Sequence, residues 1–446
     1  MDVNQISSQL QKISPFMITG TITETAGMTA CAAGFPVPYG AIAEIQRADG
    51  SVIQAEVIGF RDHTSILFPY GNMHGIRRGD QVYLRHTSPF LRVSTEMCGK
   101  ILNAQGKILS VGKESDKKSE KNTSSFSLTE RVPYVCTPPP AHERPRITEI
   151  LSTGVRVIDA LLTVGRGQRV GIFAGSGVGK SVLLGMIARY TEADVIVIGL
   201  IGERGREVND FIQRELGEHG LKKSVLVVAT SDEPAIMKVR AAQTATAVAE
   251  YFRNQGKNVL LLMDSLTRVA MAQRDIGLAA GETAVTRGYP PSVFALLPPL
   301  VERAGRTMKG DITAIYTVLV EGDDENEIIA DTVRSLLDGH IWLSRKIAAR
   351  GQYPAVDVLA SISRLMPDIC DACHQESANK LRRMLALWKE KEDVITLGVY
   401  RSGTNPELDR VIATRENVLS FLKQDVAVSC DLDTARQQLL SLVSLA

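Results

Sequence analysis

The sequence has almost no charge imbalance and no long apolar run. Its 446 residues include 51 Lys and Arg against 50 Asp and Glu, for a formal net charge of +1. This balance gives no global field that would recruit nucleic acid or an anionic membrane, although local patches stay open. No apolar run approaches the roughly 18 residues of a membrane span, so we expect no transmembrane helix.

The first residues, MDVNQISSQLQKIS, also lack the basic flank and apolar core of a secretory signal. We therefore expect a cytoplasmic protein.

Cysteines are few and scattered, at positions 31, 98, 136, 370, 373 and 430. They do not form the regular framework of a disulfide-rich domain, so we expect free thiols. The segment 370–374 spells C-x-x-C-H, the spacing of a c-type haem site. Haem attachment would require export, and we see no export signal. Chance spacing is the favoured interpretation, with metal or redox use as the remaining alternatives.

The length suggests about three domains at roughly 150 residues each. Before Pro15, the apolar residues Val3, Ile6, Leu10 and Ile13 keep a helical period and predict a short amphipathic helix. The pattern is equally compatible with docking a partner and with packing on the same chain. From residue 16 to 86, short β-branched runs alternate with turn residues, including the hairpin signal Asp49-Gly50. This alternation of short apolar runs and turns predicts a small β-barrel or sandwich.

A polar run at 113–127 and a Pro-rich stretch at 136–146 separate this region from the next. The polar run is too poor in apolar residues to order itself well, and the Pro-rich stretch is typical of an extended connector. We interpret both as surface linkage. Because the charges in the polar run are of mixed sign, we do not interpret it as a nucleic-acid arm.

Between residues 147 and 364, runs of Val, Ile and Leu alternate with helical patterns. The expected strands are 168–175, 194–202, 224–230, 258–264, 311–320 and 339–344. Nearly continuous apolar strands are buried on both faces, as in a parallel sheet flanked by helices. After Cys370 the pattern is helical. We predict an α/β fold with a P-loop, RecA-like parallel-sheet core, an N-terminal β-barrel and a C-terminal helical domain. The expected divisions are 1–90, 91–370 with a linker at 113–146, and 371–446.

The segment FAGSGVGKSVLL, from Phe173, lies between an expected strand and an expected helix. It matches the phosphate-binding pattern G-x-x-x-x-G-K-[ST], with alanine in place of the first glycine. The loop and the start of its helix comprise Ala174, Gly175, Ser176, Gly177, Val178, Gly179, Lys180, Ser181 and Val182. Backbone N–H groups of such a loop cradle phosphate oxygens. Lys180 is expected to reach the β- and γ-phosphates of ATP, and the Ser181 hydroxyl to ligate Mg²⁺.

Two carboxylates follow other expected strands. Asp264 ends the strand at 258–264, where it can orient the water shell of Mg²⁺. Glu203 lies just beyond the strand at 194–202. Because the carboxyl ends of parallel strands face the ligand crevice, Glu203 can polarise the attacking water. The structural alternatives are an aspartate that merely ends a strand and a salt bridge from Glu203 to Arg204 or Arg206.

Long segments around these residues resemble the flagellar and type III secretion export ATPases, relatives of the catalytic β subunit of rotary ATP synthases. They include LSTGVRVIDALLTVGRGQRVGIFAGSGVGKS, GLIGERGREVNDFI, MDSLTRVAMAQRDIGLAAGE and GQYPAVDVLASISR, and the match runs from about Ile147 to Met366. The barrel before it and the helices after it agree in order with that family.

The resemblance implies further roles. Glu203 matches the glutamate that positions the hydrolytic water, and Arg204 and Glu207 match neighbours that bind the phosphate end and the Mg²⁺ water shell. Arg268 matches another phosphate-side arginine, and Tyr353 the aromatic that stacks on adenine. As a bare pattern, a tyrosine before proline is more often core or turn packing. Arg364 matches the arginine finger offered to the neighbouring subunit's nucleotide, the alternative being an intrachain salt bridge.

The family also implies partners. We expect a homo-hexameric ring that hydrolyses ATP with Mg²⁺ to release chaperones from export substrates and help unfold them. The implied partners are a regulatory stator protein bound through the N-terminal helix, a central stalk protein, an export gate, chaperones and substrate proteins. The implied location is the cytoplasmic face of the inner membrane, with no nucleic acid bound.

Three other functions are compatible with parts of this pattern. One is the catalytic subunit of an ion-pumping rotary ATPase, and another is a nucleic-acid motor of the Rho or RecA kind. The barrel residues offer aromatics for the latter but few clustered basic residues. A non-catalytic nucleotide-binding subunit is the third, and the joint presence of Lys180, Glu203, Asp264 and Arg364 argues against it.

Overall fold

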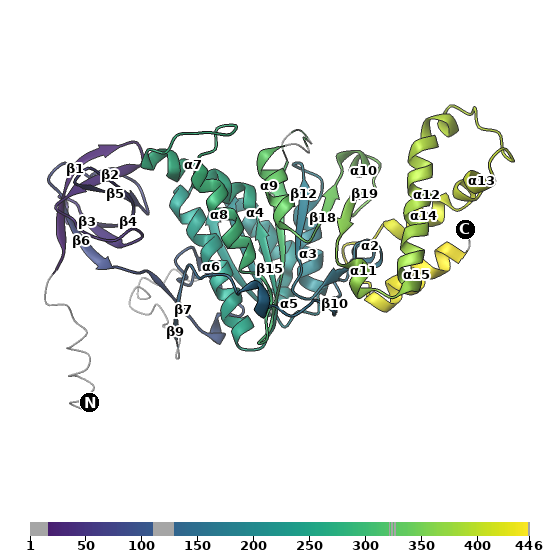
Figure 1. Cartoon of the computed structure of the whole chain (residues 1–446), viewed down its shortest axis with the longest axis horizontal. Helices are drawn as coiled ribbons and strands as arrows, with labels where there is room; N and C mark the ends of the chain where they lie inside the picture. Colours follow the sequence, from purple (N-terminus) through teal and green to yellow (C-terminus); the bar gives the residue numbers. More distant parts are fainter. Residues whose placement is uncertain (1–16, 110–128, 321, 323, 325–326, 445–446) are drawn as a thin grey trace.

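The computed structural model describes residues 17–109, 129–320, 322, 324 and 327–444 (Figure 1). The expected N-terminal helix and the polar run at 113–127 lie outside these residues. A barrel lies at one end of the molecule, the sheet with its helices in the middle, and the C-terminal helices at the other end. No helix in the described ranges is long and apolar enough to cross a membrane.

The N-terminal region folds as the expected barrel. Its strands are β1 (Thr19–Ala26), β2 (Thr29–Ala33), β3 (Ile42–Gln46), β4 (Val52–Arg61), β5 (Thr64–Pro69) and β6 (Gln81–His86), closed in the order β1-β2-β5-β4-β3-β6. The Asp49-Gly50 turn joins β3 to β4, with the Asp49 carboxylate accepting from the Ser51 N–H at 2.8 Å. Gly50 has a φ of 82°, a left-handed conformation that favours glycine there.

The central sheet runs in the order β19-β18-β12-β17-β15-β13-β14-β8, with β16 paired to β17. The strands are β8 (Ile101–Asn103), β12 (Arg169–Ala174), β13 (Val195–Glu203), β14 (Ser224–Thr230), β15 (Asn258–Asp264), β16 (Gly305–Arg306), β17 (Asp311–Leu319), β18 (Gly339–Leu343) and β19 (Val356–Ser363). All pairings are parallel except those of β16 and β19. Every strand expected from an apolar run is present. Three additional strands carry weaker signals: β8 and β16 are short, and β19 is an edge strand with exposed residues such as Leu359 and Ile362.

Helices cover both faces of the sheet because neighbouring residues of a strand point to opposite sides. Val195 and Val197 of β13 pack with α6 (Ala235–Asn254), α7 (Leu266–Ala280), α8 (Pro291–Glu302) and α9 (Ile328–Leu336). Ile196 and Ile198 pack with α2 (Arg156–Leu161), α3 (Lys180–Tyr190) and α4 (Gly205–Asp210). A short π-helical segment (Phe211–Leu216) and α5 (Gly217–Lys222) continue α4.

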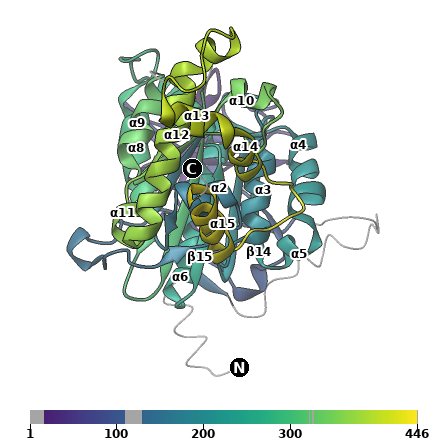
Figure 2. The same ribbon diagram turned by 90° about the vertical axis from the view of Figure 1, so that its right-hand side faces the viewer.

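The chain ends in helices α11 (Met366–Ile369), α12 (Ala372–Thr396), α13 (Pro406–Ala413), α14 (Arg415–Leu422) and α15 (Leu432–Ser444). Figure 2 views the molecule from this end. The helical pattern at 408–424 is two helices, and the chain leaves helical geometry at Thr414 between them. The remaining short elements are β7 (Phe90–Val93), β9 (Glu130–Pro133), β10 (Ile150–Leu151), β11 (Val164–Gly165), α10 (Arg345–Ala349) and single 3-10 turns at Thr95–Met97 and Ala141–Glu143.

The C-x-x-C-H segment forms the start of α12. Asp371 caps this helix by accepting from the His374 N–H at 2.9 Å, and the buried His374 ring donates from Nε2 to the Ala160 carbonyl at 2.8 Å. All six cysteines are free thiols, as expected. The spacing is therefore explained by a helix cap and a packed histidine.

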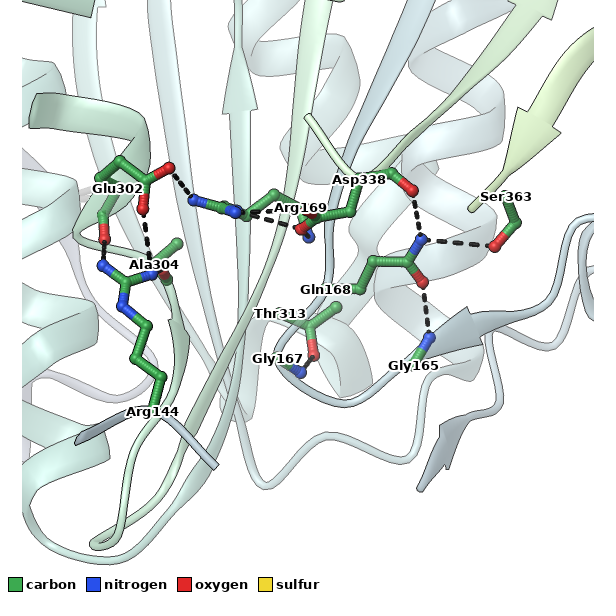
Figure 3. A network of polar contacts seen from close by, with 10 residues as sticks. All are labelled: Arg144, Gly165, Gly167, Gln168, Arg169, Glu302, Ala304, Thr313, Asp338 and Ser363. Atoms are coloured by element: carbon green, nitrogen blue, oxygen red, sulfur yellow. Dashed lines mark hydrogen bonds and ion pairs between the residues drawn. The ribbon is translucent and has the colours of Figure 1, made fainter. Parts of the chain in front are cut away.

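A polar network fixes the amino ends of the central strands (Figure 3). The Arg169 guanidinium pairs with Asp338 at 3.0 Å and also with Glu302, joining β12 to the segment before β18 and to the last residue of α8. Gln168 donates to the Asp338 carbonyl at 3.0 Å and to the Ser363 hydroxyl at 3.3 Å. The network therefore places Ser363, the last residue of β19, beside the amino ends of the parallel strands.

Candidate functional site

The phosphate-binding loop joins the end of β12 to α3, as the sequence predicts. Gly177 and Gly179 have φ angles of 79° and 91°, left-handed conformations that turn the backbone back on itself. Ala174 is the last residue of β12 and is paired with Leu319 of β17 and Leu343 of β18. Its extended backbone needs no glycine, which explains why alanine is accepted at the first position of the pattern.

The sheet order brings Lys180 together with both predicted carboxylates. β15 and β13 are neighbours, so Asp264 and Glu203 end adjacent strands on the same edge as the loop. Lys180 Nζ lies 2.5 Å from Asp264 Oδ1 and 3.5 Å from Glu203 Oε1. The ion pair of Glu203 is therefore with the loop lysine. The alternative partners Arg204 and Arg206 pair instead with Glu207 at 3.4 Å and Asp210 at 3.5 Å.

Burial governs the electrostatics of this cluster. Burial and, next, the Asp264 carboxylate raise the pKa of Glu203, Lys180 lowers it, and the net pKa is about 7. Burial lowers the pKa of Lys180, but the two carboxylates more than offset this and hold its pKa above the ordinary value. Lys180 therefore stays charged at neutral pH, while Glu203 can exchange a proton near neutrality.

The sequence interpretation missed Thr317 of β17. Its hydroxyl donates to Asp264 Oδ1 at 2.6 Å from a strand between β12 and β15. The available signal is weak: Thr317 is one of several hydroxyl residues in the run at 311–320, with Thr313 and Tyr316, and a buried hydroxyl requires a partner. Thr317 fixes the orientation of the Asp264 carboxylate.

Arg268, in the first turn of α7, packs against Gly202 immediately before Glu203. A Cβ added to Gly202 would lie 2.9 Å from Arg268 Cβ, so only glycine fits there. Arg268 Nε is buried and has no hydrogen-bond partner in the described part of the chain. An orphaned donor of this kind fits an anionic ligand at the site.

Tyr353 lies beside the loop, on the segment that leads into β19. Its ring atoms would be 3.6 Å from a Cβ added to Gly179, and its side chain is 47% exposed. The partly exposed ring next to the phosphate loop does not fit the core-packing alternative.

Arg204 and Glu207 start α4 just beyond Glu203, and both side chains are exposed. Ser181 is also exposed at the first turn of α3. The side chains of Ser181, Glu207 and Asp264 give the oxygen ligands that Mg²⁺ prefers. The residues present therefore fit a nucleotide phosphate and its metal ion.

Arg364 is the one predicted site residue that does not join the cluster. Its N–H donates to the Asp338 carbonyl at 3.0 Å, and it follows Ser363 at the amino-end edge of the sheet (Figure 3). β19 is antiparallel to β18, with Val356 opposite Leu343 and Ser363 opposite Gly339. The side chain is exposed, and in the described ranges its guanidinium makes no ion pair, so the expected intrachain alternative is not observed.

Three family models match the chain. One described as "ATP synthase alpha/beta family, nucleotide-binding domain" matches residues 154–363, and one described as "ATP synthase alpha/beta family, beta-barrel domain" matches residues 17–84. A third, described as "T3SS EscN ATPase C-terminal domain", matches residues 370–441.

Relatives carry two related names. The flagellum-specific ATP synthase of Bacillus subtilis (strain 168) is 52% identical over 84% of this chain and 83% of its own length. The type 3 secretion system ATPase of Pseudomonas syringae pv. syringae is 45% identical over 91% of this chain and 89% of its own. Among solved structures, the assembled ATPase EscN from the type III secretion system of enteropathogenic E. coli has a TM-score of 0.88 at 42% identity, covering 95% of this chain and 100% of that chain.

The barrel, the loop with its lysine and carboxylates, and the helical end define a P-loop ATPase of the ATP synthase α/β type. Within that class, the chain belongs to the family of flagellum-specific ATP synthases and type III secretion ATPases. It is an ATPase of type III protein export, and neither an ion-pumping rotary subunit nor a nucleic-acid motor is favoured by its relatives.

Proposed function

We propose that this chain forms a homo-hexameric ring in which Mg²⁺-dependent ATP hydrolysis releases chaperones from export substrates and helps unfold them. The observation that carries the proposal is the separation of Arg364 from its own phosphate loop. The loop lies at the carboxyl ends of the parallel strands, whereas Arg364 lies at their amino ends. β19 runs from opposite Leu343 to opposite Gly339 of β18, so its two ends lie about 13 Å apart at about 3.3 Å per residue of β18.

That distance exceeds the length of an arginine side chain, so the Arg364 guanidinium does not reach a nucleotide bound in its own subunit. Its side chain is exposed and is instead available to a neighbouring copy. Arg364 then serves as a finger that stabilises charge developing on the γ-phosphoryl group in the adjacent site. A ring in which each copy completes its neighbour's site follows from this placement.

Within one subunit, Lys180 binds the β- and γ-phosphate oxygens, and the loop N–H groups of residues 174–182 surround them. Ser181 and Asp264 would hold Mg²⁺, with Glu207 at its water shell. Bound Mg²⁺ neutralises charge on the transferring phosphoryl group. Arg268 and Arg204 bind the phosphate end.

Glu203 accepts the proton of the attacking water. Its position beside Lys180 and its pKa of about 7 suit a general base at neutral pH. Tyr353 stacks on adenine, supported by its place beside Gly179.

We propose the partners by family analogy. The E. coli ATPase EscN has been solved with its central stalk EscO, with a TM-score of 0.86 and 40% identity to this chain. A central stalk protein is thus proposed here too, along with an export gate, chaperones and substrate proteins. The segment before Pro15 is proposed to bind a regulatory stator protein and to bring the ring to the cytoplasmic face of the inner membrane. We retain 1–90, 91–370 and 371–446 as proposed divisions.

Two substitutions test the site. Lys180→Ala removes the charge nearest the phosphates and should weaken ATP binding, measured by titration with a fluorescent ATP analogue. Glu203→Gln should keep that affinity and lose turnover by about 10²-fold or more, because only the base acting on water is removed. Phosphate release by Glu203→Gln at the wild-type rate would contradict the assignment.

A further inference from the structure

The loop between α14 and α15 contacts the nucleotide-binding core at the segment that carries Tyr353. The backbone N–H of Gln424 donates to the Tyr353 carbonyl at 2.9 Å. Tyr353 in turn lies beside Gly179 of the phosphate loop. A residue of the C-terminal helical region is therefore bonded directly to the segment that positions the tyrosine ring.

The side chain of Gln424 is fixed on both sides. Its Nε2 donates to the Gly154 carbonyl at 2.8 Å and to the Val428 carbonyl at 2.8 Å. Its Oε1 accepts from the Arg156 N–H at 2.7 Å. Both amide atoms are thus used, and they join residues of the core to the α14–α15 loop.

The Gly154 side of this contact is rigid. The buried Asp159 carboxylate accepts from the Gly154 N–H at 3.0 Å and from the Thr153 N–H at 2.9 Å. A Cβ added to Gly154 would lie 2.3 Å from Tyr190 Cβ on α3, so the turn packs tightly against the helix that follows the phosphate loop. Gln424 is consequently held to a fixed acceptor.

Arg156 binds the carboxyl end of α14, the helix that precedes Gln424. Its guanidinium donates to the Phe421 carbonyl at 2.7 Å and the Ser420 carbonyl at 3.1 Å, and also to the Lys423 carbonyl. Carbonyls of a last helical turn have no partner within the helix, so one guanidinium satisfies several of them. The end of α14 and Gln424 are thereby held to α2.

We infer that Gln424 is a positioning residue for adenine recognition, holding the Tyr353 segment against the phosphate loop through its bonds to Gly154 and Arg156. The inference rests on the proposed stacking role of Tyr353. Gln424 joins the C-terminal helices to the nucleotide site, so a displacement of those helices changes the affinity for the nucleotide and leaves the phosphate chemistry at Lys180 intact.

The test compares Gln424→Ala, Tyr353→Ala, the double variant and wild type, as full chains at one concentration in steady-state ATP hydrolysis. Gln424→Ala should raise KM about three- to tenfold, the effect of losing roughly one hydrogen-bonded constraint, with kcat within twofold. The double variant should have the KM of Tyr353→Ala alone, since both changes act through one ring. Gln438→Ala, on α15, is the matched control because Gln438 accepts from Arg156 Nη1 at 2.8 Å, whereas the hydrogen bonds to Tyr353 and Gly154 come from Gln424. Its KM should equal that of wild type.

The outcomes separate the two claims. If Tyr353→Ala raises KM and Gln424→Ala does not, the positioning role is wrong and the adenine role stands. If the two KM effects multiply in the double variant, Gln424 acts independently of the ring and the inference fails. If Gln424→Ala raises KM but Tyr353→Ala does not, both the stacking role and the inference fail. A lowered melting temperature with unchanged KM assigns Gln424 to structure alone.

Discussion

At the residue scale, the cluster of Lys180, Glu203 and Asp264 combines one cation with two carboxylates in a largely buried site. Asp264 is 3% exposed and receives a hydrogen bond from Thr317 besides its pair with Lys180. Glu203 lies farther from the lysine, at 3.5 Å. The better-paired carboxylate suits a fixed role beside a metal ion, and the less-paired one suits a base that exchanges a proton.

The pH dependence of hydrolysis tests this division. Glu203 must be deprotonated to accept a proton, and burial together with Asp264 raises its pKa to about 7. The value of kcat/KM, which reports the free enzyme, should therefore rise as pH increases through about 7. Lowering the pH protonates the base and removes activity.

Glu207→Gln gives the matched variant for that measurement. Glu207 is one of the groups that raise the pKa of Glu203, so its neutralisation should move the acidic limb to lower pH even if turnover falls. A limb that stays at the same pH in Glu207→Gln, or a rate that is flat across neutrality in wild type, would contradict the role of Glu203.

The sequence predicts much of this site because its residues stand in local patterns. Lys180 and Ser181 belong to a contiguous motif, and Asp264 ends an apolar run. Thr317 is not predictable in this way, because its role depends on β17 lying between β12 and β15 in space. The contact of Gln424 with Tyr353 joins segments distant in sequence and likewise has no local signal.

At the element scale, long apolar strands are predicted well and short or edge strands are not. β14 and β15 fall at the expected residues because both faces of each are buried and the apolar runs are continuous. β8 has three residues, too few for a pattern, and lies at the end of the sheet beside β14. β19 is half exposed and antiparallel, so its composition does not resemble that of its neighbours.

A buried ion pair ties the elements on the α6 side of the sheet. Arg303, 2% exposed after α8, pairs with Glu250 of α6 through two bonds of 3.0 and 2.6 Å and donates to the Tyr134 carbonyl at 2.8 Å. Removing the arginine leaves a buried carboxylate without its counterion. Arg303→Met should lower stability by about 3–5 kcal/mol.

Thermal melting measures this effect. Arg85→Met, which breaks the barrel pair between the exposed Arg85 and the partly exposed Glu44, should change stability by less than about 1 kcal/mol and provides the control. Adding Glu250→Leu to Arg303→Met should recover part of the loss, since no charge then remains unpaired. Equal melting temperatures for Arg303→Met and wild type would show that the pair does not hold these elements together.

At the scale of the whole molecule, one chain brings the proposed phosphate-binding and metal-binding residues together at one site, but its own Arg364 lies too far away to reach that site. The phosphate loop lies at the carboxyl ends of the parallel strands and Arg364 at their amino ends, and no local sequence pattern reveals that separation. It follows from β19 running antiparallel to β18. Activity therefore requires assembly, and isolated monomers should bind ATP but hydrolyse it slowly.

Mixing two inactive variants tests this requirement most directly. Lys180→Ala chains keep Arg364, and Arg364→Ala chains keep an intact phosphate loop. Arg364→Ala alone should be almost inactive because a finger aimed at the γ-phosphoryl group contributes about 10³–10⁵ in rate, and Lys180→Ala alone because it lacks the lysine that binds the phosphates. In mixed rings, confirmed by native mass measurement, some interfaces pair an intact loop with an intact finger, and part of the ATPase activity should return. Mixed rings that form without any return of activity would contradict the role of Arg364 in the neighbouring site.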